Sequence, residues 1–212
     1  MNPHSIHRQP SRKIVLWEVD VQADFMLPEG KLYVPGAEKL LPNIRKLTDA
    51  ARSGHAFLVS HGCFHAADDP EFADFPAHCV KGTPGAELMP EALADAVLRI
   101  PNEDGVAIPE RLDLWQQVLM EKQTLDIFET RHVEELLKHF ALDAEFAVFG
   151  VVTEICVVRA ARGLLKRKRK VALVTDAIAS LGPEGERAIA EMRELGARLT
   201  TTSAVLAEFE KG

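Results

Sequence analysis

The sequence predicts an α/β protein with three layers, αβα, around a mostly parallel sheet of about six strands. Short apolar, β-prone segments alternate along the chain with amphipathic segments, which is typical of strands joined by crossover helices. With 212 residues, 47% of them hydrophobic, the chain can bury one sizeable core. No repeat or low-complexity tract divides it. We therefore expect a single domain over 1–212, with 1–12 as a flexible N-terminal extension.

In the first half of the chain, the apolar run K-I-V-L-W-E-V-D at 13–20 predicts the first strand. A helix is expected at 37–53, because apolar residues recur there at helical spacing and Gly54 closes the segment. A second short strand is expected at 55–60. The stretch 61–85 is rich in His, Asp, Pro and Gly and is long for a loop in a compact domain, which favours a functional loop.

The second half of the chain continues the alternation of strand and helix. Its apolar runs predict strands at 117–121, 145–150, 170–175 and 198–202. Its amphipathic runs predict helices at 130–140, around Cys156 and at 183–195. The stretch 97–114 carries no clear signal for either element.

Composition and charge argue against several classes of function. The formal net charge of −7 disfavours general nucleic-acid binding, which depends on clustered positive charge. The cationic run 166–170 follows an expected helix end, where cations complement the helix dipole, so a solvated helix end is favoured. No segment approaches the roughly 18 apolar residues of a membrane span, and the N-terminus has no signal-like apolar stretch. Three cysteines without a disulfide pattern predict reduced thiols and a cytoplasmic protein.

Cys156 lies where a buried strand passes into a helix, with Thr153 as the expected N-cap. Unpaired N–H groups and the helix dipole would favour the thiolate there, although a lone Cys in an apolar helix is more often a core residue. Asp20 ends the first strand and Lys122 follows the third. Since the carboxyl ends of parallel strands share one sheet edge, these side chains are expected to converge there. A base and a cation beside a thiol are what a cysteine nucleophile needs.

Four segments, in this order, resemble the isochorismatase-like cysteine hydrolases, and among them the nicotinamidases and their relatives. The segments are V-D-V-Q-A-D-F (19–25), P-A-H-C-V-K-G-T-P-G (76–85), the segment around Lys122 and G-V-V-T-E-I-C-V (150–157). The resemblance covers nearly the whole chain after residue 13. Within the first segment, Asp24 is expected to organise the turn.

The resemblance implies Asp20, Lys122 and Cys156 as a catalytic triad that hydrolyses a small carboxamide through a thioester. It implies the N–H groups of Val152 and Cys156 as the oxyanion hole, and a cis peptide bond between Val151 and Val152. It also implies a small-molecule amide as the partner, no organic cofactor and possible homo-oligomers.

The long loop predicts a metal site that departs from the family pattern. Metal-binding nicotinamidases carry an Asp two residues before the first ligand His. Here Cys63 stands at the Asp position, His65 and His78 match two ligand positions, and Glu71 falls near a third. These donors suit a divalent metal, and the thiol favours zinc. The alternative is a decayed site in which the histidines only line the pocket.

Other residues of the loops have expected roles that depend on the substrate. Phe25 and Phe75 match positions that form an aromatic pocket, which suits a flat ring, although core packing explains them equally well. Cys79 is expected to be structural, and His61 to be a pocket residue. The altered metal ligands also allow another heteroaromatic amide, a carbamoyl compound or a maleamate-like acid as the substrate.

Three alternative functions remain open from the sequence. An isochorismatase-type hydrolase of a vinyl ether needs no thiol nucleophile, so Cys156 weighs against it. A catalytically silent binding member of the family would not need the triad. A metal- or redox-responsive thiol protein would use Cys63 and Cys156, but no resolving cysteine is evident.

Overall fold

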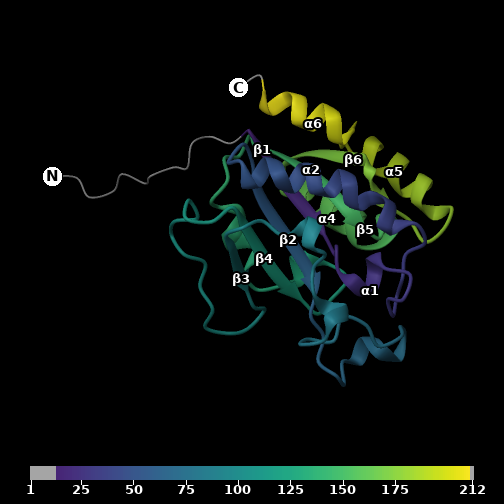
Figure 1. Cartoon of the computed structure of the whole chain (residues 1–212). Coiled ribbons are helices and arrows are strands. Elements are labelled where there is room, and N and C mark those ends of the chain that lie inside the picture. Colours follow the sequence, from purple (N-terminus) through teal and green to yellow (C-terminus); the bar gives the residue numbers. More distant parts are fainter. Residues whose placement is uncertain (1–12, 211–212) are drawn as a thin grey trace.

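One parallel sheet of seven strands runs through residues 13–210, the part of the chain that this computed structural model describes (Figure 1). The strands are β1 (Ile14–Val19), β2 (Phe57–Cys63), β3 (Val97–Ile100), β4 (Gln117–Lys122), β5 (Glu145–Val151), β6 (Lys170–Ala179) and β7 (Arg198–Thr200). Their order in the sheet is β3-β4-β2-β1-β5-β6-β7. The predicted α/β class is confirmed, with one strand more than expected. The expected extension 1–12 lies outside the described residues.

Helices cover both faces of the sheet. They are α1 (Ala23–Met26), α2 (Leu41–Arg52), α3 (Val133–Leu137), α4 (Val158–Lys166), α5 (Glu184–Glu194) and α6 (Thr202–Phe209). Helices α2 and α6 pack together on one face, while α4 and α5 pack together on the other. Short 3-10 turns lie at Ala37–Leu40, Pro70–Ala73, Pro84–Ala86, Pro90–Ala92 and Ile127–Glu129. Between residues 13 and 210, no helix is long and apolar enough to cross a membrane.

The centre of the sheet is buried on both faces, which explains the nearly continuous apolar runs of its strands. Every residue of β1 is buried, and β1 pairs in register with β2 on one side and β5 on the other. Trp17 of β1 is fully buried, stacks on Phe128 and meets the ring of Phe146 edge to face. This packing fixes the carboxyl ends of the three central strands relative to one another.

The structure corrects several element boundaries. Strand β3 lies in the stretch without a clear signal, because it is a short edge strand of four residues of which only Ile100 is buried. Helix α6 was not expected. It begins after Thr201, whose side chain caps it by accepting a hydrogen bond from the N–H of Ala204. The expected helix at 130–140 is reduced to α3, and β2 continues beyond 60 to include Cys63.

The cationic run 166–170 stabilises a neighbouring helix end. The buried guanidinium of Arg169 donates hydrogen bonds to the carbonyls of Leu137 and Ala141, at 2.7 and 2.8 Å, where α3 ends. Arg167 lies over the ring of Phe128, 3.9 Å from its centroid. The run therefore serves a helix end, but Arg169 is buried against α3 and is not part of a solvated end of the preceding helix as expected.

Candidate active site

Asp20, Lys122 and Cys156 lie together at the carboxyl end of the sheet. Asp20 directly follows β1, Lys122 ends β4, and Cys156 lies in the turn after β5. Lys122 Nζ is 3.1 Å from Asp20 Oδ2 and 3.9 Å from Cys156 Sγ. Lys122 is fully buried, and Asp20 and Cys156 are exposed by 1% and 6%. The convergence expected from the strand ends is therefore present.

The charges of this group are strongly coupled. Burial alone would raise the pKa of Asp20, but the attraction of Lys122 holds it at about 2, so Asp20 is an anion at neutral pH. Burial opposes the charge of Lys122, but the attraction of Asp20 raises its pKa well above the ordinary value. Burial and the negative charge of Asp20 raise the pKa of Cys156 despite Lys122. The resting thiolate that the helix start was expected to favour is thus opposed by burial and by the charge of Asp20.

The turn that carries Cys156 differs from an ordinary helix start. A cis peptide bond joins Val151 and Val152, as the resemblance implies. The next residues form a π-helical turn, Thr153–Val157, before α4 begins. Val152 is the cap residue, and its carbonyl accepts the N–H groups of Ile155 and Val157, both at 3.1 Å. The expected N-cap role of Thr153 is wrong, since its side chain lies inside the turn and makes no capping bond.

Local backbone geometry brings the two central strands into contact below the site. Gly150 has φ +116°, and a Cβ there would overlap the carbonyl oxygen of Val19, so only glycine fits. Asp20 has φ +52°, and its N–H donates to the carbonyl of His61 at 2.9 Å. This left-handed turn re-aims the Asp20 carboxylate at the end of β1.

Cys63, His65 and His78 form a possible metal-binding group beside the triad. One donor atom from each lies within 4.8 Å of the other two, and all three residues are buried. His65 Nδ1 is 3.0 Å from Asp69 Oδ2, and His78 Nδ1 is 2.8 Å from the carbonyl oxygen of Pro76. These acceptors place the protons on Nδ1 and leave both Nε2 atoms as free donors for a metal.

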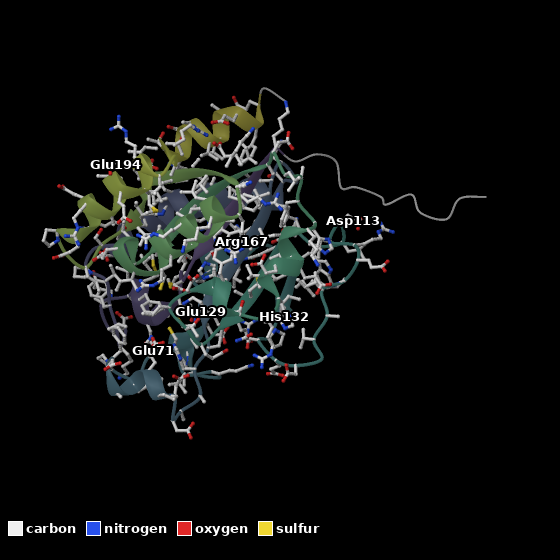
Figure 2. The ribbon with its side chains drawn as sticks, turned by 180° about the vertical axis from the view of Figure 1, so that it is seen from behind. Glu71, Asp113, Glu129, His132, Arg167 and Glu194 are labelled. Carbon is white, nitrogen blue, oxygen red and sulfur yellow. The ribbon has the colours of Figure 1, made fainter. Side chains whose placement is uncertain are left out.

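Glu71 lies against the two histidines. Its Oε1 is 3.9 Å from His65 Nε2 and 3.8 Å from His78 Nε2. Glu71 lies on the short 3-10 turn Pro70–Ala73, in the lower part of Figure 2 and far from Glu194 and Asp113. The structure therefore brings all four predicted metal-site residues to one place, next to the triad.

Cys63 belongs to the possible metal-binding group and also contacts Lys122 of the triad. Its Sγ is 2.9 Å from Lys122 Nζ, and burial raises its pKa to about 12, so its thiol is neutral in the absence of a metal. The amide side chain of Gln22 holds the backbone of Cys63, accepting from the Cys63 N–H at 2.8 Å and donating to the Cys63 carbonyl at 2.6 Å.

The carboxylate of Asp24 accepts a hydrogen bond from the N–H of Cys79 at 2.7 Å, so it organises the turn as expected. Cys79 is fully buried, and its Sγ lies 3.9 Å from the carbonyl oxygen of Gly85, which fits the expected structural role.

Aromatic rings surround His78. The rings of Phe25 and Phe75 meet it edge to face, at centroid distances of 5.3 and 6.4 Å. Phe72, which was not expected, contacts both His65 and His78. The two predicted pocket residues thus lie at the possible metal site.

Two other residues near the site were not assigned roles from the sequence. Asp69 follows His65 by four residues and directly precedes Pro70, a spacing that suggests a capped turn and a partner for the histidine. Glu18, the last but one residue of β1, is fully buried, and burial raises its pKa to about 8. A lone carboxylate in an apolar strand is the signal that could have identified it.

Comparisons with known proteins identify relatives of this sequence and fold. The family model described as "Isochorismatase domain" matches residues 15–99 and 98–204. A pyrazinamidase of Pyrococcus horikoshii solved in complex with zinc is 28% identical, with a TM-score of 0.71, over 89% of this chain and 99% of that one. A nicotinamidase from Bacillus subtilis is 24% identical, with a TM-score of 0.72, over 89% and 99%. An N-carbamoylsarcosine amidase from Thermoplasma acidophilum is 23% identical, with a TM-score of 0.69, over 89% and 96%. No curated protein matches the chain significantly.

Proposed function

The chain belongs to the isochorismatase domain family, and we propose that it is a cysteine-dependent amidohydrolase of a small carboxamide, nicotinamide or a related compound. The products would be the acid and ammonia. The observation that carries this proposal is the buried contact of Lys122 Nζ with Asp20 Oδ2, at 3.1 Å, and with Cys156 Sγ, at 3.9 Å. One thiol, one base and one cation within reach of each other are the parts of an activated nucleophile.

In the first half of the reaction, the sulfur of Cys156 attacks the amide carbonyl while Asp20 accepts the thiol proton. Because the resting proton lies on sulfur, attack and proton transfer must be coupled, with Lys122 balancing the charge. The tetrahedral intermediate then breaks its C–N bond. Asp20 returns the proton to the departing nitrogen, which leaves ammonia and a thioester on Cys156.

In the second half, water replaces the amine. Asp20, again an anion, takes a proton from water as the water oxygen attacks the thioester carbonyl. The C–S bond breaks, the acid leaves, and the proton returns to Cys156. In both halves the N–H groups of Val152 and Cys156 are the proposed donors to the oxyanion.

We further propose that the cysteine–histidine group binds a divalent metal, zinc first of all. Support comes from His65 Nε2, which is buried and has no hydrogen-bond partner among residues 13–210, as a vacant metal ligand would be. Cys63, His65 and His78 supply a thiolate and two imidazoles, with Glu71 as the fourth residue, and this donor set suits zinc. A metal held by these residues would supply a Lewis acid able to hold a ring nitrogen or a carbonyl oxygen of the substrate.

The substrate class follows from the surroundings of the metal group. Phe25 and Phe75 frame His78 with ring edges and faces, which favours a flat heteroaromatic amide. A carbamoyl compound is the second candidate, since one structural neighbour is an N-carbamoylsarcosine amidase. The three free thiols fit a reducing compartment such as the cytoplasm.

Ammonia release from a panel of amides tests the proposal. The panel contains nicotinamide, pyrazinamide, an N-carbamoyl amino acid and a maleamate, and is run with the wild type, Cys156→Ala and Cys79→Ala. Cys79 is the matched control, because it is also a buried thiol. We expect release by the wild type and Cys79→Ala and none by Cys156→Ala. Release that survives the loss of Cys156, or none from any amide, contradicts the proposal.

A further inference from the structure

His61 contacts Asp20 from the side opposite Lys122. It lies in β2, its side chain is 1% exposed, and its Nδ1 is 3.6 Å from Asp20 Oδ1. We propose that His61 is the positioning residue of this site, donating its Nδ1–H to Asp20 Oδ1 and holding the carboxylate in place against the Cys156 thiol. The catalytic consequence rests on the proposed function, whereas the contact itself does not.

The two oxygens of the Asp20 carboxylate have separate neighbours. Lys122 Nζ lies on Oδ2, at 3.1 Å, and His61 lies on Oδ1. The main chains of Asp20 and His61 are also joined, by the 2.9 Å hydrogen bond from the Asp20 N–H to the His61 carbonyl. The side-chain distance is slightly longer than a hydrogen bond, as is common for catalytic groups before a substrate closes the site.

The imidazole of His61 is held by packing and has no competing partner. Its ring meets that of Trp17 edge to face, with centroids 6.1 Å apart, and Trp17 in turn stacks on Phe128. Neither ring nitrogen has a hydrogen-bond partner at normal distance among the described residues. A buried polar ring without another partner is costly, so its contact with Asp20 is the one that offsets the cost of burial.

The charges around the ring select one tautomer. Asp20 Oδ1, 3.6 Å from Nδ1, belongs to a carboxylate that is paired with Lys122. A ring with its only proton on Nε2 would turn the Nδ1 lone pair toward this anion. The proton on Nδ1 is therefore the stable arrangement.

The catalytic consequence concerns the orientation of the base. With only Lys122 beside it, the carboxylate could rotate to present both oxygens to Nζ and turn away from the sulfur. A donor on Oδ1 prevents this rotation. Asp20 then stays aligned to take the Cys156 proton and to return it, which is a requirement of the transition state and not of substrate binding.

The first test is the tautomer of His61 in protein labelled with ¹⁵N at histidine. Long-range proton–nitrogen spectra distinguish the two neutral tautomers and the cation, and the His61→Asn variant assigns the signals. We expect the proton on Nδ1 at neutral pH. A neutral ring with its proton on Nε2 overturns the proposal, because such a ring has no Nδ1–H to donate. This measurement needs no substrate.

The second test compares His61→Leu with His61→Asn, whose amide retains an N–H near the Nδ1 position. We expect His61→Leu to lower kcat roughly tenfold or more with KM changed by less than about threefold, and His61→Asn to recover most of the loss. His132→Leu is the matched control, since His132 is a buried histidine away from the triad that bonds the carbonyl of Glu103. Equal losses in both His61 variants with folding intact, or no loss in either, overturn the proposal.

If the wild type hydrolyses no amide, the proposed function fails but His61 can still be tested. Alkylation of Cys156 by iodoacetamide then replaces turnover. Because the charge of an aligned Asp20 raises the pKa of the thiol, a misaligned Asp20 should make Cys156 react faster. We expect faster alkylation in His61→Leu than in His61→Asn. Equal rates contradict the positioning role.

Discussion

Replacing Asp20 by asparagine should slow the release of ammonia by the enzyme but speed the alkylation of Cys156. In the wild type, Asp20 is both the proposed base and a negative charge that keeps the proton on sulfur. The Asp20→Asn variant keeps the shape of the side chain and loses both. Ammonia release should fall by about 10³-fold, the usual contribution of a general base. Alkylation of Cys156 by iodoacetamide at neutral pH should become faster.

The size of the second effect follows from the position of Lys122. Its Nζ is 3.9 Å from Cys156 Sγ. At an effective dielectric constant of about 20, two unit charges at that distance attract by about 4 kcal/mol, a factor of about 10³ in an equilibrium constant. Asp20 Oδ2, at 3.1 Å from the same Nζ, offsets this attraction in the wild type. Even if only part of this attraction becomes available to the thiolate in Asp20→Asn, the alkylation rate should rise by roughly tenfold or more.

The assay must separate Cys156 from its neighbour. Cys63 Sγ is 2.9 Å from Lys122 Nζ and competes for the same positive charge, so both proteins should carry Cys63→Ala. Peptide mass spectrometry then follows alkylation at Cys156, with the buried Cys79 as the internal reference. Circular dichroism confirms folding. Unchanged or slower alkylation of Cys156, or turnover that survives without Asp20, would refute the reasoning.

Three further predictions concern stability and metal binding. The pKa of Glu18 is about 8 in the folded protein and 4.5 when the side chain is exposed. Between these pH values the folded state therefore binds one more proton than the unfolded state. The free energy of unfolding should fall by about 1.4 kcal/mol per pH unit as the pH rises from 4.5 to 8. The urea midpoint should therefore drop from pH 5 to pH 8 in the wild type and much less in Glu18→Gln; parallel curves contradict this. Cys63→Asp should shift metal content from zinc toward manganese after dialysis against an equimolar mixture, and unchanged zinc selectivity argues against a thiolate ligand. Arg169→Met should cost about 2 kcal/mol in urea unfolding through the carbonyls of Leu137 and Ala141, with ammonia release unchanged; an equal urea midpoint rules out that role.

The sequence predicted the positions of the site residues well, because those positions depend on strand ends. Asp20 and Lys122 end apolar runs, and parallel strands bring their carboxyl ends to one edge whatever the exact register. The cysteine–histidine group was predicted from the family positions of Cys63, His65 and His78, and the structure brings their donor atoms within 4.8 Å of one another. The strand at Val97–Ile100 was missed because an edge strand needs neither a long run nor full burial.

The electrostatics could not be predicted from the sequence. Whether Cys156 is a thiol or a thiolate depends on the balance between desolvation, Lys122 and Asp20, and each of these comes from tertiary packing. The helix-start argument considered only the local backbone, and that backbone is a π-helical turn without a side-chain cap. The role of His61 likewise depends on a contact between neighbouring strands that no local pattern encodes.

A cysteine at position 63, in place of the aspartate of the family pattern, reduces the negative charge beside Lys122. A carboxylate there would place a second permanent anion beside Nζ, in competition with Asp20. The neutral thiol, with a pKa of about 12, places none, so the charge of Lys122 is matched by Asp20 alone. A metal bound to Cys63 requires the thiolate, whose charge the metal itself would share. The thiol at position 63 therefore leaves the charge balance of the Asp20–Lys122 pair undisturbed, although it departs from the family pattern.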